Sequence, residues 1–438
     1  MKKKIDLTNI DIEKAKKESL CALPWMHIHL TPDHNIMPCC ITNTENTLDI
    51  VGKQEDGIDD WMNSPAMNKM RLDMLNGIKP NACNTCYKQE QSMESFRKTT
   101  LREYGHFLPS AFDDTNEDGT LNDFKMRYLD IRFSNLCNMK CRTCGSGYSS
   151  QWEIEDAKDG QHYNIPTNTV DVSKIQQDLY AQIPNLQRAY FAGGEPLITE
   201  DHYELLEEMI RVGRTDILLS YNTNLSKLKF KDKDLLNLWS KFDNRVQVYG
   251  SLDHFGDQAE YIRAGTKWDE VMKNYRTLLG SPIVELSITT SVSIFNYGSL
   301  TSFFDYLIDQ NIPPWIEPNG GAWQINPIYS PEEFSFQCMP TDLKESIAAE
   351  HLKYFEKLKA LAPDDLYEGD GRPGRAKIMY GQVTRLMSAI ESMHELARSA
   401  DKWDQLQDVF RNEVRKIDAR RGEDFKKVFP KLARLLIE

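Results

Sequence analysis

Long apolar segments are missing from this chain of 438 residues. No apolar run approaches the roughly 20 residues that a helix needs to cross a lipid bilayer. No apolar stretch follows the basic residues Lys2–Lys4, so a signal peptide is not predicted either. We therefore expect a cytoplasmic protein that has no membrane partner.

A surplus of positive charge is also missing, since 53 Lys and Arg residues face 66 Asp and Glu residues and the net charge is −13. This balance argues against a broad nucleic-acid-binding surface. The hydrophobic content of 40% and the charged content of 27% are typical of a soluble globular protein. The length predicts two or three domains, and the sequence has neither internal repeats nor low-complexity tracts.

The nine cysteines favour metal or redox sites over disulfides in the predicted compartment. Cys137, Cys141 and Cys144 form a C-x3-C-x2-C motif. Three thiolates suit a four-iron cluster and leave one iron without a protein ligand. A structural zinc site usually takes four ligands, and no fourth Cys or His lies near the motif. An iron with an open position is able to bind and reduce a small molecule.

Short apolar runs alternate with amphipathic helical patterns from residue 127 onward. This order predicts a parallel sheet with helical crossovers, built as a partial (β/α)6 TIM-like barrel with functional loops at the carboxyl ends of its strands. The expected strands are 128–133, 186–192, 217–221, 246–252, 284–294 and 315–325.

The second expected strand ends in Gly193-Gly194-Glu195-Pro196. Glycines allow a ligand to approach the backbone closely, and Glu195 offers a carboxylate to an ammonium group. An ordinary strand-to-helix turn, in which an acid near the helix start is favourable, is the alternative interpretation.

Small polar residues follow the next two expected strands, namely Asn222, Ser251 and Asp253. Their side chains suit the hydroxyls of a ribose, although turns and helix N-caps favour the same residue types. Arg263 is placed to hold a ligand carboxylate with two hydrogen bonds, and a solvated helix-end arginine is the alternative.

Together these residues resemble the radical S-adenosylmethionine (radical SAM) enzymes over about 127–326. In that family the three cysteines hold a [4Fe-4S] cluster whose open iron binds the amino and carboxylate groups of SAM. The resemblance implies that Gly193, Gly194 and Glu195 recognise the SAM amino group. By the same resemblance Ser251 and Asp253 lie among the polar positions near the ribose, Arg263 meets the carboxylate, and Ile325 lies near the adenine. Thr143 departs from the family, which often has an aromatic residue at this position, and the departure bears on the adenine contact rather than on the cluster.

Five further cysteines precede the expected barrel. Cys83 and Cys86 form a two-ligand clip that, with Cys21 and Cys39, offers four thiolates to a second, closed [4Fe-4S] cluster; Cys40 is an alternative to Cys39. Structural zinc, held by the cysteines or by nearby histidines, is the other interpretation. The alternating residues 25–30 predict a strand that leads into a hairpin near 33–35.

This block resembles the auxiliary-cluster modules called SPASM and twitch domains. Those modules usually follow the barrel, whereas here the matching residues precede it, and His34 stands where the module's hairpin usually has glycine. Residues 1–104 are therefore expected to form a small cysteine-rich α+β module, 105–126 a linker, 127–330 the barrel and 331–438 a helical region. Cys338 is expected to be a buried apolar residue, with a hydrogen-atom donor as the alternative.

The expected function is reductive cleavage of SAM to methionine and a 5'-deoxyadenosyl radical that abstracts hydrogen from a substrate. The resemblance to enzymes with auxiliary clusters places a peptide or protein side chain first, and a sugar, nucleotide or other small molecule second. A flavodoxin or ferredoxin is the expected electron donor. A zinc-binding structural or regulatory protein is the alternative of another class.

Overall fold

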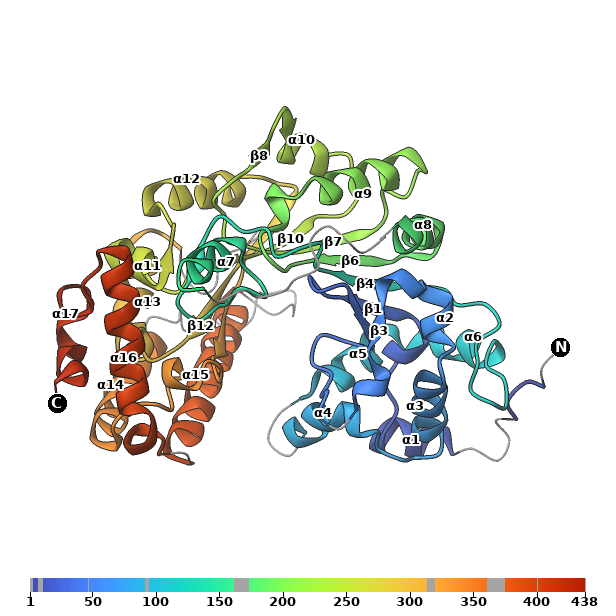
Figure 1. The fold of residues 1–438 in the computed structure, drawn as a ribbon, viewed down its shortest axis with the longest axis horizontal. Coiled ribbons are helices and arrows are strands. Elements are labelled where there is room, and N and C mark those ends of the chain that lie inside the picture. The colour runs from blue at the N-terminus through green and yellow to red at the C-terminus, as the bar shows by residue number, and fades with distance from the viewer. Residues whose placement is uncertain are drawn as a thin grey trace. The chain divides into compact units, whose positions relative to one another are not determined.

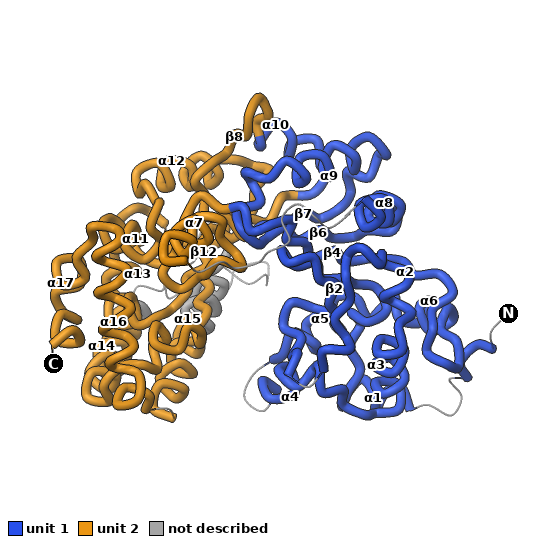
Figure 2. The backbone as a smooth tube through the Cα atoms, in the orientation of Figure 1, with its two compact units in different colours: residues 1–136, 162–221, 235–244 blue, residues 137–161, 222–234, 245–438 orange. Residues whose placement is uncertain are grey.

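The computed structural model describes residues 3–6, 11–45, 47–90, 94–160, 173–312, 320–360, 375–399 and 401–437 (Figure 1). The chain forms two compact units (Figure 2). Unit 1 contains residues 1–136, 162–221 and 235–244, and unit 2 contains residues 137–161, 222–234 and 245–438.

Unit 1 is built around a sheet with the strand order β7-β6-β4-β1-β2-β3. Its strands are β1 (His27–Leu30), β2 (Asn35–Met37), β3 (Gly52–Lys53), β4 (Tyr128–Ile131), β6 (Arg188–Phe191) and the first part of β7 (Leu218–Thr223). Its helices are α1 (Ile12–Glu18), α2 (Ile58–Met62), α3 (Pro65–Leu75), α4 (Asn84–Gln89), α5 (Phe96–Tyr104), α6 (Leu108–Asp113), α8 (Ser173–Gln182), α9 (Glu200–Arg211) and α10 (Leu235–Trp239).

The expected N-terminal hairpin is present, and it also extends the barrel sheet. Strands β1 and β2 pair antiparallel, with His29 opposite Met37. On its other side β1 pairs in parallel with β4, so that His29 lies opposite Asp130. The sequence pattern predicted the hairpin but not this second pairing, because parallel partners far apart in the chain leave no local signal.

The two faces of the unit 1 sheet differ in chemistry. Leu129, Ala189 and Phe191 are buried on one face, where the ring of Phe191 meets that of His202 on α9 with 5.0 Å between centroids. Helices in a (β/α) barrel cover the outside of the sheet, so this apolar face is the outer face. Successive side chains of a strand alternate between faces, and the opposite, inner face is polar.

Residues 105–126 differ from the open linker that their polar composition predicts. They contain α6, and their apolar side chains Phe112, Leu121 and Phe124 are buried. The ring of Trp25 packs edge-on against Phe112 with 5.4 Å between centroids. The few apolar residues in this stretch therefore fold it into unit 1.

Unit 2 contains the parallel strands β10 (Val246–Ser251), β12 (Val284–Val292) and β13 (Gly320–Pro327) in the order β13-β12-β10. Short strands β5 (Lys140–Cys141) and β11 (Arg263–Ala264) form a separate pair, as do β8 (Lys229–Phe230) and β9 (Lys233–Asp234). Its helices are α7 (Ser150–Ala157), α11 (Gly256–Ile262), α12 (Trp268–Leu279), α13 (Leu300–Asp309), α14 (Thr341–Ala360), α15 (Arg375–Ser399), α16 (Trp403–Arg421) and α17 (Phe425–Val428).

The α/β fold class predicted from the sequence is confirmed. Each of the six expected strands corresponds to a strand of the structure, namely β4, β6, β7, β10, β12 and β13. The first residues of the sixth expected strand, 315–319, lie outside the described residues. Parallel strands alternating with helices give the partial TIM-like barrel, and the helices from 341 onward form the expected C-terminal region (Figure 1).

No helix in the described ranges combines the length and the apolar content that crossing a membrane requires.

Candidate functional site

The loop that carries Cys137, Cys141 and Cys144 follows β4 and is held by backbone pairing within unit 2. Strand β5 pairs antiparallel with β11, which places Cys141 opposite Arg263. The indole N–H of Trp152 donates to the carbonyl of Cys141 at 2.7 Å, and the hydroxyl of Ser149, the N-cap of α7, donates to the carbonyl of Met139 at 2.6 Å. The start of α7 thus fixes the curvature of the cysteine loop.

The three thiols lie in surroundings that suit bonding to cationic iron. Burial raises the pKa of the Cys141 thiol, although Arg263 opposes this effect, and burial together with Cys141 raises the pKa of Cys144 to about 11. The Sγ of Cys141 accepts from Nη1 of Arg263 at 3.8 Å, and the Sγ of Cys137 accepts from the backbone N–H of Met139 at 3.4 Å. No group of three or more His, Cys, Asp or Glu side chains in the described residues is arranged to hold a metal ion. A bound cation favours the thiolate that burial alone disfavours, so the donor chemistry of these three residues suits a cluster.

Arg263 forms a buried ion pair with Asp253. Its Nε lies 2.7 Å from Oδ2 and its Nη2 lies 3.1 Å from Oδ1 of this carboxylate. Asp253 also accepts from the backbone N–H of Ser291 at 2.8 Å. Both carboxylate oxygens of Asp253 therefore accept hydrogen bonds. Nη1 of Arg263 does not contact Asp253 and points to Cys141, so it is placed for a further partner. Asp253 therefore orients Arg263, and the ribose contact expected of Asp253 stays a prediction.

The other expected ligand residues of unit 2 lie at the carboxyl ends of strands. Ser251 ends β10 and lines a small cavity together with Asn224, Asp253 and Arg263. Asn222 is half-buried near the end of β7, and Ile325 is half-buried on β13 opposite Thr290. The structure therefore brings Ser251, Asp253 and Arg263 together, while Asn222 and Ile325 keep their expected roles as predictions.

Gly193 and Gly194 are required by the close packing of their loop in unit 1. Gly193 has a positive φ of 112°, and a Cβ on Gly194 would lie 2.2 Å from the carbonyl oxygen of Leu136. The same carbonyl accepts from the backbone N–H of Glu195 at 2.8 Å. This loop thus packs against Leu136, the residue that immediately precedes Cys137, and hydrogen-bonds to it.

Glu195 is buried, with 2% of its surface exposed. Its carboxylate accepts from the backbone N–H of Leu197 at 3.1 Å and caps a 3-10 turn. This is the local role that the sequence left open as an alternative. The expected contact of Glu195 with an ammonium group stays a prediction.

The second cysteine set gathers in unit 1. Burial raises the pKa of Cys83, and the nearby thiols Cys21 and Cys86 raise it further. Burial raises the pKa of Cys39 as well, with contributions from Cys40, Cys83 and Cys21. Neighbouring thiols that disfavour one another's negative charge suit a cationic iron–sulfur core, which offsets part of the charge of four thiolates.

Cys39 and Cys40 face different neighbours. Sγ of Cys39 shares a hydrogen bond of 3.5 Å with the hydroxyl of Thr42. The same thiol interacts electrostatically with Cys21 and Cys83. Cys40 is exposed, and it interacts electrostatically with Asp130 on the barrel strand β4 and with Arg132. These surroundings favour Cys39 as the ligand. Cys338 is fully buried in unit 2, as an apolar side chain would be.

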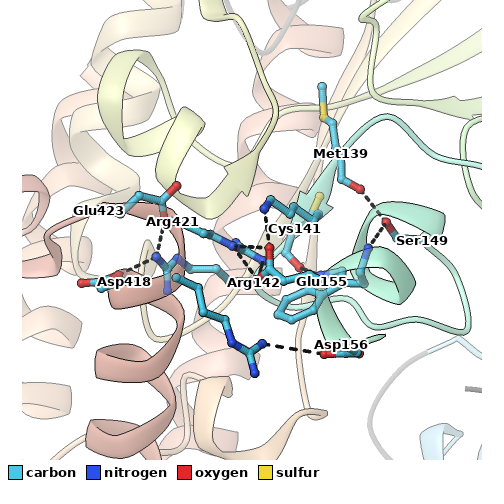
Figure 3. A network of polar contacts seen from close by, with 12 residues as sticks. Met139, Cys141, Arg142, Ser149, Glu155, Asp156, Asp418, Arg421 and Glu423 are labelled. Atoms are coloured by element: carbon cyan, nitrogen blue, oxygen red, sulfur yellow. Dashed lines mark hydrogen bonds and ion pairs between the residues drawn. The ribbon is translucent and has the colours of Figure 1, made fainter. Parts of the chain in front are cut away.

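A buried ion-pair network anchors the cysteine loop to the C-terminal helices of unit 2 (Figure 3). Arg142 has no exposed surface, and its Nη2 contacts Asp418 at 2.6 Å and also contacts Glu423. Its guanidinium lies 3.6 Å from the centre of the Tyr261 ring. Arg421 contacts Glu155 on α7 at 3.0 Å. No sequence motif indicates this network, because its residues lie far apart in the chain.

Two family models match the chain. Residues 131–295 match the radical SAM superfamily, and residues 21–87 match SPASM, an iron–sulfur cluster-binding domain. No curated protein matches the chain. These two domains call for a [4Fe-4S] cluster with SAM in the barrel and for additional iron–sulfur cluster binding in the N-terminal module.

Solved structures similar to the chain share little sequence with it. The structure described as native anSMEcpe with bound AdoMet and Cp18Cys peptide is 14% identical, with a TM-score of 0.35, and the similarity covers 52% of this chain and 59% of that chain. Streptococcus suis SuiB is 14% identical, with a TM-score of 0.31, and the similarity covers 74% of this chain and 68% of that chain. The structure of TYW1 with a lysine-pyruvate adduct bound is 15% identical, with a TM-score of 0.28, and the similarity covers 56% of this chain and 72% of that chain. The chain thus spans less than two thirds of the length of anSMEcpe.

Proposed function

We propose that this chain, which belongs to the radical SAM superfamily and carries a SPASM domain, modifies a peptide or protein side chain by abstracting a hydrogen atom. When bound, the cluster supplies the electron that splits SAM into methionine and a 5'-deoxyadenosyl radical. The observation that carries the proposal is the presence of two separate cysteine sets, one in each unit, which lie within the residues that match the SPASM and radical SAM models.

The residues of the first set hold the reactive end of SAM. Cys137, Cys141 and Cys144 bind three irons and leave the fourth open. Arg263, locked by Asp253 with Nη1 directed at Cys141, keeps a guanidinium donor beside the cluster for a carboxylate. Ser251, in the same small cavity, supplies a hydroxyl for the ribose.

The residues of the second set provide a site that takes or relays an electron. All four thiolates of Cys21, Cys39, Cys83 and Cys86 are used as ligands, so this cluster has no open iron for a substrate. A cluster of this kind suits a reaction whose substrate radical must lose one more electron. Enzymes that resemble this chain in carrying such a module often act on peptides, and this supports the choice of substrate.

A peptide encoded next to the gene of this protein is the probe that tests the substrate class. The iron-loaded, reduced enzyme is incubated with SAM and the synthetic peptide, and the peptide mass is measured. A mass change that requires SAM and is lost in Cys141→Ala supports the proposal. If peptides stay unmodified while a sugar or nucleotide is converted, the substrate class is wrong although the SAM chemistry stands.

A further inference from the structure

A cavity of about 250 Å³ lies in unit 2, between the starts of α11 and α13 and the 3-10 turn Pro430–Leu436. Ser302 and Lys431 are exposed at its edge, so the cavity opens to solvent. Residues from 296 onward lie outside both ranges that match the family models. The walls include none of the residues assigned to the cluster or to SAM. The lining residues that matter below are Phe255, Gln258, Ser299, Ser302, Phe429 and Lys431.

Two aromatic rings give the cavity rigid apolar walls. The ring of Phe255 stacks on that of Tyr306 with 4.3 Å between centroids and 6° between planes. The ring of Phe429 meets that of Tyr261 edge-on at 5.2 Å, and Tyr261 in turn carries the Arg142 guanidinium over its face. Walls that neighbouring rings hold in place need no further ordering when a ligand binds, and this lowers the free-energy cost of binding.

The volume and the walls suit one apolar side chain of a peptide. An engineered apolar cavity of about 150 Å³ in another protein binds benzene. The cavity of about 250 Å³ therefore accommodates a phenylalanine or leucine side chain together with part of its backbone. Gln258 donates to the carbonyl of Val428 at 3.2 Å, and its own carbonyl oxygen is placed to accept from a peptide N–H group.

The chain segment beside the cavity is positively charged, although the whole chain is acidic. Residues 425–437 contain three lysines, one arginine and no Asp or Glu, whereas the net charge of the chain is −13. Lys426, Lys427 and Lys431 are exposed, and none of them forms an ion pair with a carboxylate in the part of the chain that the structure describes. Arg434 pairs with Asp342. The three lysines are therefore the cations that a partner meets here.

Nearby carboxylates offset only part of this charge. Asp424, the N-cap of α17, accepts from two backbone N–H groups of its own helix at 3.0 and 3.3 Å, and Asp257 on α11 is exposed. The first turn of α13 adds partial positive charge, because its N-cap Ser299 makes no side-chain hydrogen bond to it. The hydroxyl of Ser299 lies instead 3.0 Å from Nε2 of His254. The surface thus favours a negatively charged partner.

The shape of the site favours a peptide segment over a folded acidic protein. A folded protein would meet the exposed lysines with a convex surface and would leave the cavity empty. An extended segment places one apolar side chain in the cavity, while carboxylates before and after that side chain contact the lysines. Attraction of this kind sets specificity and weakens as salt is added.

We propose that this cavity is an exosite, a binding site apart from the reacting centre, for an acidic segment of the peptide substrate. One apolar side chain of the segment enters between Phe255 and Phe429, and its neighbouring carboxylates contact Lys426, Lys427 and Lys431. The inference rests on the proposed function, which supplies the peptide. Unit 2 also carries the cysteine loop, so a segment held here raises the effective concentration of the rest of the peptide at that unit.

A binding measurement tests the exosite without turnover. The iron-loaded enzyme is titrated into a fluorescein-labelled peptide that has a central Phe flanked by Glu residues, and the anisotropy is followed. We expect the affinity to fall by at least about tenfold in the triple variant Lys426→Gln, Lys427→Gln, Lys431→Gln. The matched control is Lys14→Gln, Lys241→Gln, Lys273→Gln, which removes the same charge from exposed positions elsewhere and should bind like the wild type. Equal losses in the two triple variants, or no binding to the wild type, would overturn the proposal.

A second variant tests the cavity itself. Ser302→Trp places an indole in the mouth of the cavity from an exposed position, which the fold should tolerate, and the peptide should bind at least about tenfold more weakly. A peptide with Ala in place of its Phe should lose affinity for the wild type to a similar extent. Equal affinities of the wild type for this peptide and for one with Gln in place of Glu would contradict the charge contacts only if both match the original peptide, and the proposal would then fail. If an acidic ferredoxin depends on the lysines while Ser302→Trp binds the peptide normally, the surface belongs to the electron donor and the proposal is wrong.

Turnover separates failure of the exosite from failure of the proposed function. With a peptide that the enzyme converts, the lysine variant should raise KM more than it lowers kcat, because it removes binding far from the reacting atoms. Conversion with an unchanged KM would overturn the exosite and leave the proposed function standing. Lysine-dependent binding of the acidic peptide, with no peptide converted, would support the binding site and overturn the proposed function.

Discussion

Nη2 of Arg142 lies 2.6 Å from Oδ1 of Asp418, a residue 276 positions further along the chain. Arg142 stands between two of the cluster cysteines, and Asp418 belongs to α16. Glu423 contacts the same nitrogen. The C-terminal helices therefore contribute the counter-charges for a guanidinium buried beside the candidate cluster site, and this links the cluster loop to a region of the chain that carries no motif.

Removing these counter-charges should loosen the cluster loop. The double variant Asp418→Asn, Glu423→Gln leaves Arg142 buried without an ionic partner, which costs about 3–5 kcal/mol in comparable cases. We expect a lower free energy of unfolding and a loss of iron from the barrel cluster during gel filtration. The control is Asp342→Asn, which breaks the exposed pair with Arg434 and should change stability by less than about 1 kcal/mol. Unchanged iron content in the double variant would show that the C-terminal helices do not support the loop.

The two cysteine sets should lose iron independently. Wild-type enzyme purified without oxygen should contain about eight irons and eight sulfides, four for each cluster. Cys141→Ala and Cys86→Ala should each retain about half of this iron, and only Cys141→Ala should lose SAM cleavage entirely. Cys338→Ala, in a buried position outside both sets, should retain all of it. Zinc in place of iron and sulfide would support the structural-metal alternative.

Gly194→Ala should disrupt the loop around Leu136. The added Cβ would lie 2.2 Å from a backbone oxygen, which cannot move aside as a flexible side chain does. We expect SAM binding, measured by equilibrium dialysis, to weaken by at least about tenfold, equivalent to about 1.4 kcal/mol. Gly280→Ala is a suitable control, because its Cβ would meet atoms only at 3.5 Å and beyond. Equal SAM affinities in the two variants would contradict the role given to this loop.

Stability should fall as the pH drops below about 6.5, because His202 is buried. Burial lowers the pKa of His202 to about 3, whereas the unfolded chain has the ordinary value of about 6.5. Between these values the unfolded state binds a proton that the folded state does not, so acid favours unfolding by up to about 1.4 kcal/mol per pH unit. Urea unfolding at pH 7.5 and pH 5.5 should show a smaller decrease for His202→Gln than for the wild type. His106→Gln, at an exposed position, should leave the decrease unchanged.

Local patterns predicted most of the secondary structure and the cysteine motif. Strand β10 and helix α12 follow directly from their apolar periodicity, and Cys137, Cys141 and Cys144 from their spacing. Such signals are available because they depend on neighbours within a few residues. The pairing of β1 with β4 and the packing of residues 105–126 left no comparable signal, since both depend on partners far away in the chain.

The candidate site likewise contains residues that local sequence patterns indicated and residues whose role depends on distant partners. The sequence indicated Arg263 and Asp253 as separate ligand contacts, whereas the structure binds them to each other in one buried pair. Arg142 and Asp418 were not indicated at all. In each case the chemistry of the residue depends on a partner that only the fold brings close.

Formation of 5'-deoxyadenosine tests the central claim most directly. Iron-loaded enzyme is reduced without oxygen and mixed with SAM, and 5'-deoxyadenosine and methionine are quantified by mass spectrometry. The proposed function predicts equal amounts of the two products from the wild type and neither from Cys141→Ala. Enzyme with full iron content that releases no 5'-deoxyadenosine, or a Cys141→Ala variant that releases as much as the wild type, would contradict it.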